Sequence, residues 1–391
     1  MIRLNYKKEC CGCYACASVC PKGCIEMRED NEGFRYPVID VGVCINCSLC
    51  EKVCPVINQN KERTPLKTYA AKNQDEAIRK QSSSGGIFTL LAKQTIARGG
   101  TVFGAGFDKK WEVCHASAQT LTELTAFRGS KYLQSRVEDT YCQAEALLKR
   151  GTEVLFSGTP CQIAGLKGYL RKEYENLLTV DFVCHGVPSP AVWREYLKVL
   201  LANTKEPPER IGEIRFRNKK SGWKNYSLTI SSAKAKNSPS IISQPYNKNL
   251  FMRGFLKDIY LRPSCHACPA KKFKSGSDTT LGDYWGIQHV LPEFDDEKGV
   301  SLIMTNTPKG EGRYLSLKAE QHETTYGEAL KNNPSIEKSA PLKFERTVFY
   351  RNFAQEDLLN LINRLTKNSF PARIRRKLQN LFHKRRKTDK L

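Results

Sequence analysis

Residues 10–21 read CCGCYACASVCP, and residues 44–55 read CINCSLCEKVCP. Both stretches contain the run C-x2-C-x2-C-x3-C-P, and ten of the sixteen cysteines of the chain lie between Cys10 and Cys54. Disulfides are rare in the reducing cytosol, so such crowding favours metal ligation. Three thiolates on one tight loop can bind a single polynuclear centre, while the fourth is carried away on the following turn.

The doubled run resembles that of bacterial ferredoxins with two [4Fe–4S] clusters, in which the fourth cysteine of each run binds the other cluster. On this pattern one cluster takes Cys10, Cys13, Cys16 and Cys54, and the other takes Cys44, Cys47, Cys50 and Cys20. Two structural zinc sites are the alternative, but zinc does not explain the third spacing or the Cys-Pro endings. Cys11 and Cys24 fall outside the pattern and are interpreted as small core residues.

Composition sets the class and the compartment. The chain has 391 residues and a formal charge of +23, and a hydrophobic content of 40% is enough for a sizeable core. It shows no apolar run of about 18 residues and no secretory signal. We therefore expect two or three domains in a cytoplasmic protein, either soluble or peripheral at the inner face of the membrane.

The pattern along the chain predicts mixed α+β and α/β structure. Residues 1–60 form a two-cluster ferredoxin-like domain, 61–67 a linker, 68–325 a mixed-sheet α/β domain and 326–391 a helical appendage. Strands are predicted at 101–107, 153–156, 177–183 and 299–306, and helices at 138–150 and from Pro160 to about Tyr169. Thr159 and Ser189 are predicted helix N-caps, each followed by proline.

A third set of cysteines lies in the α/β part. Cys161 and Cys184 each follow a predicted strand, and Cys265 and Cys268 have ligand spacing. A thiolate in the first turn of a helix, as expected for Cys161, is stabilised by the helix dipole. These four cysteines are candidates for a third cubane, with a Cys265–Cys268 redox disulfide or a zinc site as alternatives. Two further cysteines within predicted elements, Cys114 and Cys142, are interpreted as buried thiols.

Several motifs after residue 60 resemble the β-subunit family of coenzyme F420 hydrogenases and dehydrogenases. The family also includes plant hydroxymethyl-chlorophyll reductase and bacterial proteins encoded among polysaccharide-synthesis genes. The resemblance implies a [4Fe–4S] cluster on the third cysteine set. The matching motifs lie at Ser83–Gly86, Arg128–Tyr132, Phe156–Gln162, Val183–Ser189, Arg262–Cys268 and Ser277–Gly286.

The resemblance also implies FAD, although the chain has no Rossmann fingerprint. A small-residue loop entering a helix can offer backbone N–H groups to the pyrophosphate. Lys131 would supply a cation and Tyr132 a phenol, while Gly158 and Thr159 would let the backbone approach the isoalloxazine. Asp283 and Trp285 would close the pocket. Each of these features alone is equally typical of an ordinary loop or of packing. The full set is Ser83, Ser84, Gly85, Gly86, Gly129, Ser130, Lys131, Tyr132, Gly158, Thr159, Asp283 and Trp285.

His185 stands in the densest of these motifs, and the other five histidines carry no comparable context. It is the candidate proton donor to a substrate or hydrogen-bond donor to a cluster sulfur. A buried structural histidine is the alternative.

The C-terminal stretch from Pro371 contains nine Lys or Arg and one Asp, with Ile374, Leu378, Leu381 and Phe382 at helical spacing. This pattern is typical of a basic amphipathic helix on an anionic membrane surface, and a solvated tail is the alternative.

The leading hypothesis is an iron–sulfur flavoprotein oxidoreductase. It would take electrons from a ferredoxin or another low-potential donor and pass them through the clusters and FAD to a small organic or sugar- or lipid-linked substrate. Members of the family reduce different molecules, so the resemblance does not fix the acceptor. The alternatives are an electron-transfer subunit of a partner reductase, without its own substrate, and a zinc-stapled nucleic-acid-binding protein; no nucleic-acid module is recognised.

Overall fold

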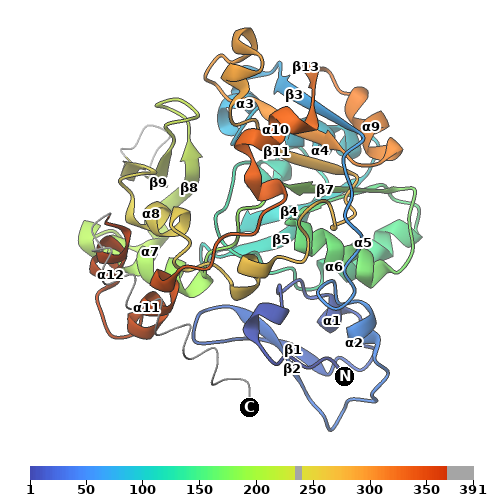
Figure 1. The fold of residues 1–391 in the computed structure, drawn as a ribbon, viewed down its shortest axis with the longest axis vertical. Coiled ribbons are helices and arrows are strands. Elements are labelled where there is room, and N and C mark those ends of the chain that lie inside the picture. The colour runs from blue at the N-terminus through green and yellow to red at the C-terminus, as the bar shows by residue number, and fades with distance from the viewer. Residues whose placement is uncertain (234–239, 368–391) are drawn as a thin grey trace.

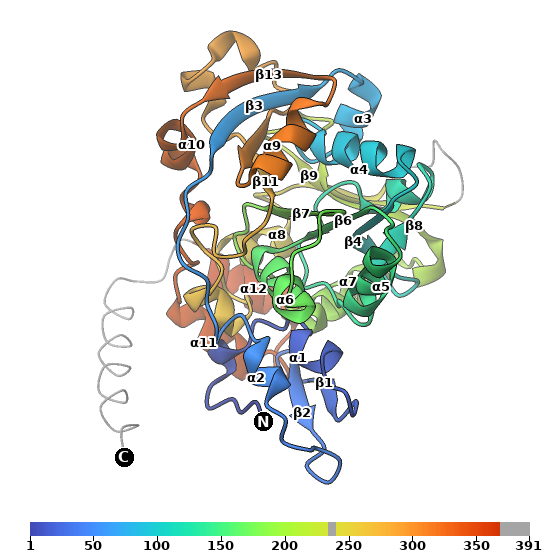
Figure 2. The same cartoon turned by 90° about the vertical axis from the view of Figure 1, so that its right-hand side faces the viewer.

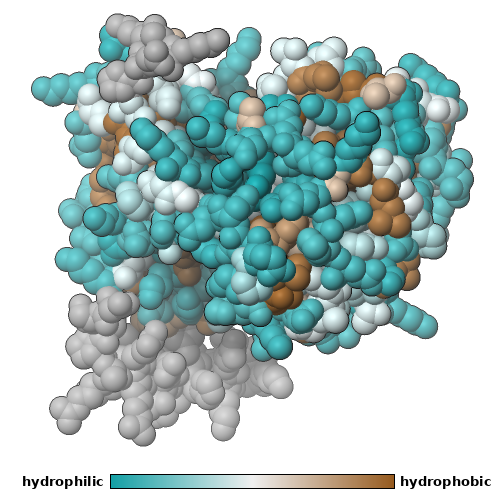
Figure 3. Space-filling view, turned by 90° about the horizontal axis from the view of Figure 1, so that it is seen from above, coloured by the Kyte–Doolittle hydropathy of each residue, from teal (hydrophilic) through white to brown (hydrophobic). Residues whose placement is uncertain are grey.

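The fold was obtained as a computed structural model, which describes residues 1–233 and 240–367. The predicted basic tail lies outside the described residues. None of the helices within the described residues combines the length and the apolar character of a bilayer-spanning segment. On the face seen from above, hydrophilic side chains predominate and hydrophobic ones form small separate patches (Figure 3).

The N-terminal part consists of two halves, each with one cysteine run, one single-turn helix and one strand. A two-stranded antiparallel ribbon, β1 (Ile25–Glu29) and β2 (Arg35–Ile39), connects two single-turn helices, α1 (Ala15–Ser18) and α2 (Leu49–Lys52). In both cysteine runs the residues flanking the second cysteine are left-handed: Gly12 (φ 68°) and Tyr14 (φ 68°) in the first, Asn46 (φ 53°) and Ser48 (φ 58°) in the second. Because of this shared conformation, both loops curve in the same way around a central space.

One eight-stranded sheet forms the centre of the molecule (Figure 1). In spatial order its strands are β13 (Ala319–Thr324), β3 (Lys67–Asn73), β12 (Ser301–Thr305), β11 (Thr279–Asp283), β7 (Leu177–Phe182), β6 (Val154–Gly158), β4 (Thr101–Phe107) and β5 (Val113–Ala118). β11, β7, β6 and β4 are parallel, whereas the pairs β13–β3, β3–β12, β12–β11 and β4–β5 are antiparallel. Since two antiparallel steps separate β3 from β11, β3 runs in the same direction as the four parallel strands.

Both faces of the sheet are covered, and this explains why β6 and β7 are buried along most of their length. On one face Leu91 of α4 (Ile87–Ala97) packs with Val102 and Leu155. On the other face α5 (Thr140–Lys149) and α6 (Pro160–Leu170) pack against Phe103 and Phe156. Figure 2 shows α4 and the α5–α6 pair on opposite sides of the strands.

A second, three-stranded sheet of order β10-β9-β8 lies beside the large one. It consists of β8 (Ile211–Asn218), β9 (Ser227–Ser232) and β10 (Ser240–Pro245). Its helices share one core with it, built on Trp193, Phe216 and Phe251. They are α7 (Pro190–Thr204), α8 (Leu250–Leu256), α11 (Phe344–Asn352) and α12 (Leu358–Thr366). The remaining helices are α3 (Glu76–Gln81), α9 (Pro308–Leu315) and α10 (Tyr326–Asn332).

The mixed α/β class and most predicted elements are confirmed. β4 has the predicted bounds, and α6 begins at Pro160 after the Thr159 cap, where Thr159 and Gln162 form a capping box. α5 begins two residues later than predicted because Glu138 is left-handed (φ 51°), so the helix cannot start there. Cys142 is a correction: it is exposed, because the helical period turns Tyr141 and Ala144 to the sheet and Cys142 away.

Candidate metal centres and flavin site

Two hollows in the N-terminal part are each lined by four of the predicted ligands. The first is lined by Cys10, Cys13, Cys16 and Cys54, and the second by Cys20, Cys44, Cys47 and Cys50. Each hollow therefore combines three cysteines of one run with the fourth cysteine of the other. This is the exchange of ligands predicted from the two runs, although the ligand assignment itself stays a prediction.

Burial differs between the two hollows. Cys13, Cys16 and Cys54 are buried, whereas Cys44 is half-buried and Cys47 is exposed. Burial raises the pKa of Cys16 to about 12. A thiolate in such a place needs a positive centre to compensate its charge, as iron in a cluster does.

The extra cysteines of the N-terminal part lie beside these hollows. Cys24 is buried, and its sulfur lies 3.3 Å from that of Cys20. Cys11 is also buried, and it lines the first hollow. Their predicted place in the core is therefore confirmed.

A third hollow is lined by Cys161, Cys184, Cys265 and Cys268, which come from three distant segments. Cys161 lies in the first turn of α6, Cys184 follows β7, and the last two lie in or just after a 3₁₀ turn at Pro263–Ala267. Because β6 and β7 are parallel, their carboxyl ends meet at one edge of the sheet, and this brings Cys161 and Cys184 together.

Polar groups surround the sulfurs of the third hollow. The Val187 backbone N–H donates to Cys265 Sγ at 3.4 Å, and Thr159 Oγ1 lies 3.2 Å from Cys161 Sγ. The Lys271 ammonium donates to the Cys184 carbonyl at 2.6 Å. Hydrogen bonds to sulfur and nearby cations are the means by which proteins stabilise anionic clusters.

The alternatives to cubanes differ in geometry. All sixteen cysteines are free thiols in the structure. Within residues 1–233 and 240–367 no three His, Cys, Asp or Glu side chains are grouped as ligands of one metal ion. A cubane binds its thiolates at separate corners, so four cysteines around a hollow suit it without meeting at a point.

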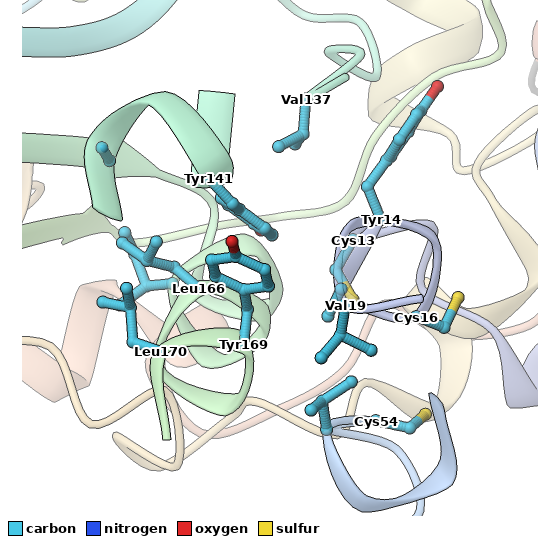
Figure 4. Packing of buried hydrophobic residues seen from close by; sticks show 14 of the residues in the cluster. Cys13, Tyr14, Cys16, Val19, Cys54, Val137, Tyr141, Leu166, Tyr169 and Leu170 are labelled. Carbon is cyan, nitrogen blue, oxygen red and sulfur yellow. The ribbon is translucent and has the colours of Figure 1, made fainter. Parts of the chain in front are cut away.

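The N-terminal part packs directly on α6, and two glycines make this contact close. A Cβ added at Gly165 would lie 2.9 Å from Cys13 Sγ, and one added at Gly168 would lie 2.5 Å from the Val53 carbonyl oxygen. Figure 4 shows Cys13 facing Tyr141 and the residues of α6. The first hollow is thereby held against the helix that carries Cys161.

The predicted flavin residues after β3 and in the 128–132 loop lie together. Ser83 Oγ lies 2.8 Å from Ser130 Oγ and accepts from the Ser130 N–H at 2.6 Å. Ser84 is buried and donates to the Val300 carbonyl. The Gly85 N–H donates to Ser301 Oγ, so this N–H is already bonded, which corrects its predicted role toward a pyrophosphate.

The other residues of the 83–86 and 128–132 segments are placed as follows. Gly86 is left-handed (φ 85°) and forms the N-cap of α4, and Gly129 is also left-handed (φ 79°). The Lys131 ammonium donates to the Ala126 carbonyl at 2.7 Å, and burial lowers the pKa of Lys131 to about 7.

Tyr132, Asp283 and Trp285 meet around one arginine that the motifs did not reveal. Arg217 of β8 is buried and pairs with Asp283, and its guanidinium carbon lies 5.4 Å from the centre of the Trp285 ring. Trp285 in turn stacks on Trp223 with ring centres 4.8 Å apart. Burial raises the pKa of Tyr132, and the positive charge of Arg217 opposes this rise.

Several buried polar atoms in this neighbourhood have no partner among the described residues. They are Arg217 Nε, Trp223 Nε1 and Asp283 Oδ1. Buried polar groups are nearly always hydrogen-bonded, so these atoms keep hydrogen-bonding capacity that the described residues do not use. Lys219 adds a cation whose pKa is lowered to about 7 by burial, and it donates to the Ser84 carbonyl.

His185 connects this neighbourhood to the third hollow, which it lines. Its ring meets Phe255 edge-on at 5.3 Å, and Phe255 stacks on Tyr132 at 4.7 Å. His185 Nε2 lies 2.6 Å from Asp258 Oδ1, and Lys343 pairs with the other oxygen of Asp258 at 2.7 Å. Burial opposes the charge of Asp258, yet these hydrogen bonds hold its pKa below the usual range.

The remaining two predicted flavin residues, Gly158 and Thr159, lie at the end of β6, and Thr159 lines the third hollow. Asp181 lines it too and was not predicted. Burial raises the pKa of Asp181 to about 6, although Ser275 and Thr280 donate to it. The sequence signal that could have identified Asp181 is a carboxylate within an otherwise apolar strand.

Three family models match the chain. Two of them describe the beta chain of coenzyme F420 hydrogenase/dehydrogenase: the model of its carboxyl-terminal part matches residues 151–326, and the model of its amino-terminal part matches residues 68–140. A 4Fe-4S dicluster domain matches residues 9–58, so the N-terminal part is an iron–sulfur domain.

Individual proteins are similar to parts of this chain. One of the F420H2 dehydrogenase subunits from Methanosarcina mazei is 26% identical over 208 residues, which are 49% of this chain and 58% of that protein. The chain thus spans less than two thirds of that relative. A 7Fe ferredoxin of Hydrogenibacillus schlegelii is 41% identical over 64 residues, 16% of this chain and 76% of the ferredoxin. A chain of the F420-reducing [NiFe] hydrogenase complex of Methanosarcina barkeri aligns with TM-score 0.44 and 15% identity, over 78% of this chain and 91% of that chain.

Proposed function

The chain belongs to the coenzyme F420 hydrogenase/dehydrogenase β-subunit family, and from this premise we propose that it is an iron–sulfur flavoprotein oxidoreductase. It accepts electrons from a ferredoxin-type donor and reduces a small organic or sugar- or lipid-linked substrate. When bound, the clusters carry single electrons and FAD combines two of them for transfer to an organic molecule.

The observation that carries this proposal is that the third hollow shares Cys11 with the first hollow and is linked by ring contacts to the polar neighbourhood of Tyr132. Among the cysteines that line each hollow are four predicted ligands, the donor set that a [4Fe–4S] cluster requires. The third hollow leads through His185 and Phe255 to Tyr132. The site lies beyond the carboxyl ends of parallel strands, where α/β sheets bind ligands.

The residues around Tyr132 suit FAD in charge and in hydrogen bonding. Arg217 and Lys219 supply cations for a pyrophosphate or an anionic reduced flavin, and the free Nε of Arg217 and Nε1 of Trp223 supply donors. Trp285 offers an aromatic face. Ser83 and Ser130 join the two loops that would enclose the cofactor.

We also propose that His185 holds and delivers a proton at Nδ1, because its Nε2 is bonded to Asp258. Asp258 fixes the orientation of the ring, and Lys343 keeps Asp258 ionised. His185 is about one third exposed, so a substrate can reach it from solvent. Replacing His185 with Gln should lower substrate reduction while leaving reduction of the flavin by the donor unchanged.

Anaerobic reductive titration tests the function. The loaded protein should take up about five electrons per chain, one for each of three clusters and two for the flavin. Absorbance reports the flavin, and electron paramagnetic resonance (EPR) reports the reduced clusters. Uptake of about two electrons, with no flavin signal, would contradict the proposal, since it leaves only the N-terminal clusters.

A second candidate is a relay subunit without its own substrate. It is favoured by the name of the M. mazei relative, which is a subunit of a dehydrogenase. Stable co-purification with a second enzyme, and no turnover of the isolated chain with a reduced ferredoxin, would support the relay.

A further inference from the structure

The first and third hollows share one residue, Cys11, which lines both of them. Its thiol interacts with Cys13 of the first cysteine set and with Cys161 of the third. The two sets are therefore separated by little more than one side chain.

A buried guanidinium lies at this junction. Arg262 is fully buried, and it donates through Nε to the Cys10 carbonyl at 2.8 Å. Its Nη2 lies 3.5 Å from Cys10 Sγ, and its Nη1 donates to Gln134 Oε1 at 2.8 Å. Gln134 Nε2 in turn donates to the Cys11 carbonyl.

The charge of Arg262 acts on both cysteine sets. Cys10 and Cys265 are among the groups whose negative charge would act on the guanidinium. Cys265 lines the third hollow and lies three residues further along the chain, with its N–H bonded to the Arg262 carbonyl. Arg262 therefore stands between the first hollow and the third.

Arg262 also differs from the other buried arginines in its partners. Arg79, Arg217 and Arg346 are each paired with a carboxylate, namely Asp296, Asp283 and Glu32. Within the described part of the chain no carboxylate pairs with Arg262. A buried charge without a counter-ion is costly, so an anion at this place would compensate it.

We propose that Arg262 sets the reduction potentials of the first N-terminal cluster and the third cluster together. The inference rests on the proposed function, because it requires both clusters. A cluster ligated by four thiolates is an anion that gains negative charge on reduction, so a nearby cation stabilises its reduced form. Low dielectric strengthens this interaction at a buried site, and cluster potentials depend on net charge and on hydrogen bonds to sulfur. Arg262 is a positioning residue that acts on the electron carriers and touches no substrate.

The test is a redox titration by EPR on anaerobically purified full-length protein. In Arg262→Gln the reduction waves of two clusters should shift to lower potential, while that of the second N-terminal cluster stays. A tenfold weaker stabilisation of the reduced form corresponds to about 59 mV for a one-electron couple. The variant Cys47→Ala, which removes a ligand of the second cluster, identifies the wave that should stay.

Three further variants complete the test: two separate the charge of Arg262 from its structural role, and the third is a control. Arg262→Lys keeps the charge and should restore most of the potential. Gln134→Glu leaves the guanidinium in place and puts a carboxylate beside it, so that the pair carries no net charge. It should therefore lower the same two potentials, and it tests the charge even if Arg262→Gln loses its first cluster. Arg28→Gln removes a cation of the same domain that is exposed beside Glu26, and it should shift nothing.

The outcomes distinguish the inference from the function on which it rests. Iron and sulfide content shows whether the clusters are present in each variant. Unchanged waves in Gln134→Glu and in a fully loaded Arg262→Gln would overturn the role of Arg262 and leave the function standing. A wild-type protein without three reduction waves would overturn both.

Discussion

The two N-terminal hollows and the third hollow are lined by the same number of cysteines but are assembled differently. Each N-terminal hollow draws on two short runs that lie within 45 residues, between Cys10 and Cys54. The third draws on three distant segments, two of which the sheet brings together, because Cys161 and Cys184 follow neighbouring parallel strands. The N-terminal hollows thus depend on local loop geometry, and the third depends on the folded α/β core.

The two regions also differ in their surroundings. The second hollow reaches the surface at Cys47, where Val41, Val43 and Ile45 are exposed. The third lies beside the orphaned polar atoms of the Tyr132 neighbourhood. Under the proposed function, the donor would approach the N-terminal part and the substrate would approach the Tyr132 neighbourhood.

The largest expected effect comes from removing one ligand in each region. Cys47→Ala and Cys184→Ala should each lower iron by about four atoms per chain, since each removes one cubane. Only Cys184→Ala should also change the flavin absorbance, because its hollow adjoins His185 and Tyr132. Iron analysis and flavin spectra of both variants check this. An unchanged iron content in Cys184→Ala would show that the third hollow holds no cluster.

The packing of the N-terminal part on α6 gives the next effect. Gly165→Ala should destabilise the protein by about 1–3 kcal/mol, because the new methyl group would overlap Cys13 Sγ. In contrast, Gly312→Ala in α9 meets no atom within 4 Å and should stabilise by about 0.5–1 kcal/mol. Thermal unfolding and limited proteolysis compare the two variants. Equal stability of the two variants would contradict close packing of the N-terminal part on α6.

Acid should weaken the α/β region through His115, whereas residues 1–60 contain no histidine. Burial lowers the pKa of His115 to about 4. As pH falls below about 6.5, the unfolded chain takes up a proton that the native protein refuses, so stability falls between about pH 6.5 and 4. At pH 5 the loss should be about 2 kcal/mol.

The matched variant for this prediction is His115→Gln, which can still hydrogen-bond Ser135. The difference in stability between wild type and variant should change with pH as described. Taking the difference removes the opposite contribution of Asp181, whose raised pKa favours the folded state at low pH. A pH-independent difference would contradict a neutral buried His115.

The smallest expected effect concerns flavin affinity. Arg217→Met should weaken FAD binding about tenfold, or about 1.4 kcal/mol, through the loss of one charged donor. Iron content should stay at the wild-type value. Arg194→Met removes an arginine paired with Glu29 and Glu112 and should leave FAD affinity unchanged. Isothermal titration of the flavin-free protein with FAD measures both; equal affinities would remove Arg217 from the site.

The sequence was sufficient where chemistry and structure are local. The doubled cysteine run predicted which cysteines share a hollow, and strand pattern with capping residues predicted β4 and the start of α6. It was insufficient where remote segments meet. Arg217, Lys219 and Trp223 lie in or just after β8, in a stretch without motifs, and only the packing of the second sheet brings them to Trp285. The unpaired state of Arg262 likewise follows from tertiary contacts.

The most direct test of the account is a cofactor count on protein purified without oxygen from cells that assemble iron–sulfur clusters. Three cubanes and one flavin predict about twelve irons, an equal amount of acid-labile sulfide and about one FAD per chain. About eight irons and no flavin would mean that the chain holds only its two N-terminal clusters and serves as an electron relay. Zinc in place of iron, with no sulfide, would contradict the account altogether.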